Sequence, residues 1–185
     1  MPSSAEISAV LDAAAVGIAE QAESHTTPVV VIDGRSGSGK STLASLVAPR
    51  LDAYVLALDS VYPGWDGLRA GVERVLHGVL LARASGYDGR WRAWDWNAGT
   101  PAEEHVVPSG RALIIEGAGS LTPETKALSD VQVWVESPEA SRRSRALRRD
   151  GDTYRPHWDR WAAQEAAHIA AAAPEKLATF VVRVP

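Results

Sequence analysis

The chain has 185 residues, 45% of them hydrophobic, a formal net charge of −4 at pH 7 and no cysteine. This length suits one domain, and the acidic balance gives no general attraction to nucleic acid or to acidic membranes. The lack of cysteine excludes disulfides and thiolate zinc sites, and no apolar run approaches the roughly 18 residues of a membrane span. We expect one cytoplasmic domain over residues 1–185 with no nucleic-acid or membrane partner and an open oligomeric state, a homodimer being one option.

The first predicted element is a helix over residues 4–25. Ser4 is a residue type that caps helix N-termini, and apolar side chains then recur at helical intervals at Ile7, Val10, Leu11, Ala14 and Ile18. This segment carries no recognisable chemistry, so we expect it to pack against the domain.

A buried strand over residues 29–33, a glycine-rich turn and a helix are predicted next. Gly34, Gly39, Lys40 and Ser41 match the phosphate-loop pattern G-x-x-x-x-G-K-[ST]. Glycines let successive backbone N–H groups point at one anion, and the helix adds the positive end of its dipole. Lys40 is expected to contact the β- and γ-phosphates and Ser41 to ligate Mg²⁺. The predicted nucleotide-binding residues are Gly34, Arg35, Ser36, Gly37, Ser38, Gly39, Lys40, Ser41 and Thr42.

A second strand, predicted over residues 54–58, ends just before Asp59. Ligands of open α/β sheets bind beyond the carboxyl ends of the strands, so Asp59 is a candidate base for an acceptor hydroxyl. A loop over residues 63–67 then leads into a helix whose apolar positions run from Leu68 to Leu80.

Segment 85–108 is rich in glycine and aromatic residues and is predicted to form a short extended arm. Residues 65–96 hold four of the seven tryptophans of the chain. Rings this dense form either a small satellite core or a platform on which a flat ligand stacks, and both interpretations stay open. The platform would place Trp65, Trp94 and Trp96 against a substrate.

A third strand, within residues 111–115, leads to Glu116 and Gly117. An acid at a strand end beside a phosphate loop can hold Mg²⁺ directly or through water, so Ser41 and Glu116 are the candidate metal ligands. A solvated glutamate at the start of a loop is the alternative. A short helix over residues 123–129 and a strand over residues 131–135 are predicted to follow.

A helix predicted to begin at Pro138 and to end at Gly151 carries five arginines. These arginines either complement the helix dipole in solvent or supply Arg145 and Arg149 to a lid, over residues 142–157, that closes on the transferred phosphate. Their spacing places Arg142, Arg145 and Arg149 on one face, with a packing stripe expected opposite at Ala140, Ser144 and Leu147.

The last part of the chain is predicted as a polar loop over residues 151–157, a helix and a final strand over residues 179–183. Trp158, Trp161, Glu165 and His168 share one face of that helix. His157 and His168 are interpreted as ordinary surface or core histidines, because no second ligand stands at metal-binding spacing. The order of elements predicts a doubly wound parallel sheet with helices on both faces.

These residues resemble the uridine kinase group of P-loop nucleoside kinases. The resemblance rests on the phosphate loop, on Asp59, Ser60, Val61 and Tyr62, on Ile114, Ile115, Glu116 and Gly117, and on the arginine-rich segment that ends at Asp150. It implies a core sheet of about five parallel strands, ATP as the donor, Asp59 as the catalytic base, Glu116 near Mg²⁺ and Tyr62 near the acceptor.

The tripeptide Trp94, Asp95 and Trp96 is similar to the Tyr-Asp-Phe of that group, which lies on an arm that contacts the nucleoside base. The group follows this tripeptide with a base-contacting His and an Arg, whereas this chain continues with Asn97, Ala98, Gly99 and Thr100. We therefore expect an ATP- and Mg²⁺-dependent kinase of a small-molecule hydroxyl whose acceptor stays open. A P-loop hydrolase or switch that acts without an acceptor is the alternative hypothesis.

Overall fold

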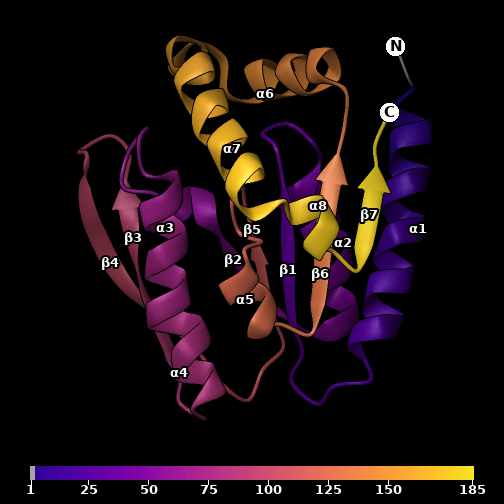
Figure 1. Cartoon of the computed structure of the whole chain (residues 1–185), viewed down its shortest axis with the longest axis vertical. Coiled ribbons are helices and arrows are strands. Elements are labelled where there is room, and N and C mark those ends of the chain that lie inside the picture. The colour runs from indigo at the N-terminus through magenta and orange to yellow at the C-terminus, as the bar shows by residue number, and fades with distance from the viewer. Residues whose placement is uncertain (1–2) are drawn as a thin grey trace.

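A central sheet of five parallel strands organises the computed structural model, which describes residues 3–185 (Figure 1). Its order is β2-β5-β1-β6-β7. The strands are β1 (Val29–Gly34), β2 (Tyr54–Ala57), β5 (Leu113–Glu116), β6 (Val131–Glu136) and β7 (Phe180–Arg183). The predicted doubly wound parallel sheet is confirmed, and β1, which leads into the phosphate loop, lies in its centre between β5 and β6.

Helices cover both faces of the sheet and create two apolar cores. Helices α1 (Ser4–Ala22) and α2 (Lys40–Leu51) pack on one face, and α3 (Leu68–Val75) and α7 (Trp158–Ala172) pack on the other. Neighbouring residues of a strand enter opposite cores, so Ile114 faces α1 and α2 while Ile115 faces α3 and α7. Burial on both faces explains why the central strands β1 and β5 are continuous apolar runs rather than alternating ones.

The N-terminal helix begins at Ser4, as predicted, but its N-cap is one residue earlier than predicted. Ser3, not Ser4, is the N-cap, because its side chain accepts a hydrogen bond from the Glu6 amide while the Glu6 carboxylate accepts one from the Ser3 amide at 2.7 Å. Both residues form a capping box, and the helix ends at Ala22 rather than near residue 25.

The predicted arm is an antiparallel hairpin of β3 (Gly89–Asp95) and β4 (Thr100–Val107) that lies apart from the main sheet (Figure 1). The helix before it is α3, a π-helical turn over Leu76–Leu80 and α4 (Leu81–Ala84). Gly78 in the π-helical turn has no side chain, and a Cβ there would lie 2.4 Å from the carbonyl oxygen of Arg90. This glycine therefore lets the hairpin lie directly against the helix.

Helix α6 (Glu139–Tyr154) lies beyond the carboxyl ends of the strands, and its packing differs from the prediction (Figure 1). Ala140 and Ser144 are exposed, whereas Arg142 and Ala146 are buried, so the predicted packing stripe was wrong. Gly151 does interrupt the helix, with φ 57° and ψ −136°. The expected loop after it is instead a further helical turn and a 3₁₀ turn over Arg155–His157, because the Tyr154 ring is buried in the core and draws the segment inward.

The remaining elements connect the sheet strands. Helix α5 (Pro123–Ala127) precedes β6, and α8 (Pro174–Leu177) links α7 to β7. Within residues 3–185, no helix combines the length and apolarity needed to span a bilayer.

Candidate active site

The phosphate loop connects β1 to α2 in the centre of the sheet. Gly37 and Gly39 have φ values of 75° and 111°, and Gly39, the N-cap of α2, makes no side-chain capping bond. The first amides of the helix are thus open to an anion. The Lys40 side chain is buried, and its ammonium group donates a hydrogen bond to the carbonyl oxygen of the loop residue Arg35 at 3.3 Å. These residues fit a bound phosphate chain.

Gly37 cannot carry a side chain without moving the loop. A Cβ there would lie 2.2 Å from the carbonyl oxygen of Arg142. Gly37→Ala is therefore expected to lower the unfolding free energy by about 2–4 kcal/mol, from left-handed strain plus the clash. Gly64→Ala is the matched control, because Gly64 has φ 78° and open space around its Cα. Urea unfolding that gave equal losses for both variants would contradict the tight packing of Gly37.

Ser41 and Glu116 come together at the start of α2 and the end of β5. The Ser41 hydroxyl donates to Glu116 Oε1 at 2.9 Å, so two oxygen ligands lie side by side next to the loop. Burial raises the pKa of the Glu116 carboxyl, and the nearby Lys40 charge opposes that rise. In the described part of the chain, no group of three or more His, Cys, Asp or Glu side chains is arranged to hold a metal ion by itself. A hydroxyl and one carboxylate suit Mg²⁺, which takes its other ligands from phosphates and water.

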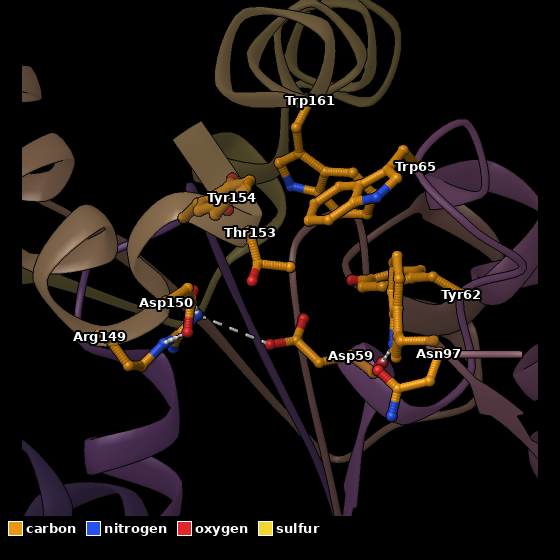
Figure 2. A pocket seen from close by; sticks show the side chains of 11 residues that line it. Asp59, Tyr62, Trp65, Asn97, Arg149, Asp150, Thr153, Tyr154 and Trp161 are labelled. Atoms are coloured by element: carbon orange, nitrogen blue, oxygen red, sulfur yellow. Dashed lines mark hydrogen bonds and ion pairs between the residues drawn. The ribbon is translucent and has the colours of Figure 1, made fainter. Parts of the chain in front are cut away.

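Asp59 lines a cavity of about 450 Å³ next to the phosphate loop, and Figure 2 shows its carboxylate inside this cavity. It sits in the 3₁₀ turn Leu58–Ser60 that follows β2, and Ser36 of the loop lines the same cavity. Arg149 from α6 binds Asp150 with two hydrogen bonds of 2.7 and 2.8 Å, and its Nη2 lies 3.9 Å from Asp59 Oδ2. Asp59 and Arg149 are both more than half exposed, so they are accessible from the cavity.

Aromatic rings form the wall of this cavity that faces Asp59 (Figure 2). The Trp65 ring stacks on the rings of His157 and Tyr154, with centroid distances of 4.2 and 5.5 Å. The centroid of the Trp96 ring lies 4.9 Å from that of Trp65. Trp96 also donates its indole N–H to the Asp59 carbonyl oxygen at 2.8 Å. The aromatic residues that line the cavity are Tyr62, Trp65, Trp96, Tyr154 and Trp161.

The predicted substrate residues divide into two groups. Tyr62, Trp65 and Trp96 line the cavity with Asp59, whereas Trp94 and Asp95 do not. The Asp95 carboxylate accepts bonds from the Asn97 and Ala98 amides and so closes the hairpin turn. The aromatic residues therefore form both a core and a surface on which a ligand could stack. Tyr62 and Trp161 are buried in the core, whereas Trp96 is 39% exposed.

Comparison with solved structures identifies the fold. A possible uridine kinase from Bacillus stearothermophilus aligns with a TM-score of 0.67 and 19% identity, over 95% of this chain and 98% of that one. A candidate fructose transport system kinase from Silicibacter sp. TM1040 aligns with a TM-score of 0.62 and 24% identity, over 92% of this chain and 98% of that one. The chain has the P-loop kinase fold.

Two curated proteins are similar to this chain in sequence over part of their length. A cytidylate kinase from Rhodococcus jostii (strain RHA1) is 34% identical over 106 residues, which are 56% of this chain and 42% of that protein. An ATP-dependent dethiobiotin synthetase from Rhodopseudomonas palustris (strain HaA2) is 27% identical over 128 residues, 60% of this chain and 56% of that protein. The chain thus spans about half the length of these relatives, and no protein-family model matches it.

The two arginines assigned to the lid have different surroundings in this P-loop kinase fold. Arg149 lines the cavity, but Arg145 donates to the carbonyl oxygens of Gly37 and Pro185, at 2.8 and 3.2 Å, and to the Ser137 hydroxyl. Arg145 thus binds the backbone of the phosphate loop at Gly37 and does not line the cavity in this conformation. Its contact with a transferred phosphate, and the closure of segment 142–157, stay predictions.

The P-loop kinase fold also brings in acids that sequence reasoning missed. Asp33 is 1% exposed and accepts hydrogen bonds from the amides of Gly34, Gly119 and Leu121, at 2.6, 2.8 and 2.9 Å. The Asp33 carboxylate also contacts the His168 ring, whose Nε2 lies 2.8 Å from Asp33 Oδ2. Asp33 thereby joins the phosphate loop to the segment after Glu116. The rule that singled out acids at strand ends could have found it, because Asp33 directly precedes Gly34.

Proposed function

We propose that the protein is an ATP- and Mg²⁺-dependent kinase that phosphorylates a hydroxyl group of a small molecule. The observation that supports this most strongly is that Asp59 and Ser36 of the phosphate loop line one cavity. A carboxylate that faces a phosphate-binding loop is the arrangement that an in-line transfer to a hydroxyl requires. The kinase neighbours of the same fold agree with this proposal.

The reaction needs positioning and charge neutralisation more than covalent chemistry from the protein. The acceptor oxygen forms a bond to the γ-phosphorus as the bond from that phosphorus to the β,γ-bridging oxygen breaks, and the hydroxyl proton passes to the Asp59 carboxylate. Lys40 and Arg149 would bind the phosphate oxygens, and Ser41 and Glu116 would hold Mg²⁺, which neutralises phosphate charge when bound.

The cavity favours an uncharged acceptor with a flat face. Its volume of about 450 Å³ suits a small molecule, and its rings offer stacking surfaces of the kind that nucleosides and sugars use. Asp59 and Asp150 place two carboxylates in the lining against the single guanidinium of Arg149, which disfavours an acceptor that already carries a phosphate.

The function is tested by acceptor-dependent release of ADP. The purified chain with Mg²⁺ and ATP is screened against nucleosides, sugars and vitamin precursors in a coupled assay. At least one acceptor is expected to raise ADP release above the hydrolysis background. Turnover of ATP that no acceptor stimulates would overturn the kinase proposal and favour a P-loop hydrolase.

Removing the Lys40 ammonium is expected to weaken nucleotide binding strongly. Lys40→Met keeps the buried aliphatic stem but loses the charge, so the dissociation constant of Mg²⁺ with a non-hydrolysable ATP analogue is expected to rise about 10- to 100-fold. Isothermal titration calorimetry measures this. Lys126→Met, at an exposed lysine of α5, is the matched control. Equal affinities of the Lys40→Met variant and the native chain would contradict the assigned role of Lys40.

A further inference from the structure

A buried carboxylate from α7 contacts the phosphate loop. Glu165 is 3% exposed, and its Oε1 accepts a hydrogen bond from the Ser36 amide at 2.6 Å. Its Oε2 lies 3.5 Å from Arg35 Nε, a buried nitrogen that has no hydrogen-bond partner within residues 3–185. Glu165 therefore contacts two consecutive residues of the loop through its two oxygens.

The carbonyl group of the same loop residue, Ser36, is held by Arg142. This guanidinium is buried and donates to the carbonyl oxygens of Ser36 and Ser137, at 3.2 and 3.0 Å. Burial and the neighbouring Arg35 charge lower the pKa of Arg142, and the Glu165 charge opposes that effect. The Ser36 amide is thus held by the Glu165 carboxylate of α7, and the Ser36 carbonyl oxygen by the Arg142 guanidinium of α6.

Helix α7 also contributes to the acceptor cavity. Trp161, one helical turn before Glu165, lines that cavity together with Ser36 and packs edge-on against Tyr62 at 4.9 Å. His168, nearly one turn after Glu165, contacts Asp33 at the end of β1. One face of α7 therefore meets the acceptor wall, the phosphate loop and the strand that leads into that loop.

We propose that Glu165 is a positioning residue for nucleotide binding. A phosphate loop binds anions through amides that converge on one point, and an amide directed at an internal carboxylate is withdrawn from that set. By holding the Ser36 amide toward α7, Glu165 sets the orientation in which the following amides of the loop face the phosphates. The proposal rests on the proposed function, because it assigns to the loop the binding of a nucleotide.

Two substitutions separate the position of the Glu165 oxygen from its charge. Glu165→Asp keeps the charge but withdraws the carboxylate by one methylene, so it no longer reaches the Ser36 amide. Glu165→Gln keeps an oxygen within reach of that amide but removes the negative charge. The positive charges of Arg35 and Arg142 are then no longer balanced by Glu165, and this change does not disfavour the binding of an anion. Glu175→Gln makes the same chemical change at an exposed glutamate that pairs with Arg183 on the surface.

Calorimetric titration with Mg²⁺ and adenylyl imidodiphosphate tests the proposal, after circular dichroism has shown that each variant is folded. Glu165→Asp is expected to raise the dissociation constant about tenfold, while Glu165→Gln and Glu175→Gln change it by less than about threefold. Unchanged affinity in Glu165→Asp, or weakening by Glu165→Gln as large as that by Glu165→Asp, would overturn the positioning role. Failure of the native chain to bind the analogue would instead overturn the proposed function.

Discussion

Asp59→Asn is expected to lower the rate of phosphoryl transfer by about 10²- to 10⁴-fold while it leaves nucleotide affinity almost unchanged. An amide cannot accept the proton that the acceptor hydroxyl loses, but it keeps the shape of the side chain and the indole contact to the Asp59 carbonyl oxygen. Single-turnover kinetics with the acceptor identified by the ADP screen, together with calorimetric nucleotide titration, measures the two effects separately.

Asp52→Asn provides the control for this substitution. Asp52 is an exposed acid whose carboxylate pairs with Arg111, and its left-handed backbone conformation is one that asparagine tolerates well. Its transfer rate should match that of the native chain. If Asp59→Asn retained full transfer, Asp59 would not be the base. If it lost nucleotide affinity instead of transfer, the carboxylate would belong to the nucleotide site.

Asp33→Ala is expected to lower the free energy of unfolding by roughly 3 kcal/mol or more. The substitution leaves the buried amides of Gly34, Gly119 and Leu121 without their acceptor and removes the partner of His168. Urea unfolding followed by tryptophan fluorescence measures the loss.

Asp130→Ala is the matched comparison for Asp33. Asp130 also accepts from a backbone amide at the sheet, that of Val29 at 2.8 Å, but it makes one such bond and is partly exposed. Its expected cost is about 1 kcal/mol. Equal losses in the two variants would show that Asp33 does not hold the loops together as the hydrogen bonds indicate.

The predictable part of the molecule is the part whose signals are local. The strand, loop and helix from Val29 to Leu51, and the acids Asp59 and Glu116 at strand ends, follow from apolar runs, glycine spacing and the topology rule for parallel sheets. Because these features depend on neighbours in the sequence, the expected fold and the meeting of Ser41 with Glu116 agree with the structure.

The rest depends on contacts between distant segments. Helical spacing predicted that the arginine face of α6 points away from the core. Arg142 is nevertheless buried, because its guanidinium donates to the carbonyl oxygen of Ser36, a residue 106 positions away in the sequence. Glu165 and Asp33 are likewise acids whose partners lie in other elements. No periodicity within one helix or strand reveals such a partner. The position of Asp33 at a strand end could have singled it out, but the partners of all three residues are seen only in the folded chain.

The hydrogen bond between the Trp96 indole and the Asp59 carbonyl oxygen has a consequence for the position of Asp59. This bond joins the tip of the hairpin to the 3₁₀ turn that carries the proposed base. An outward movement of the tip must therefore either break the bond or move the turn as well. A change in hairpin length that moves Trp96 is therefore expected either to shift Asp59 or to break the hydrogen bond between them.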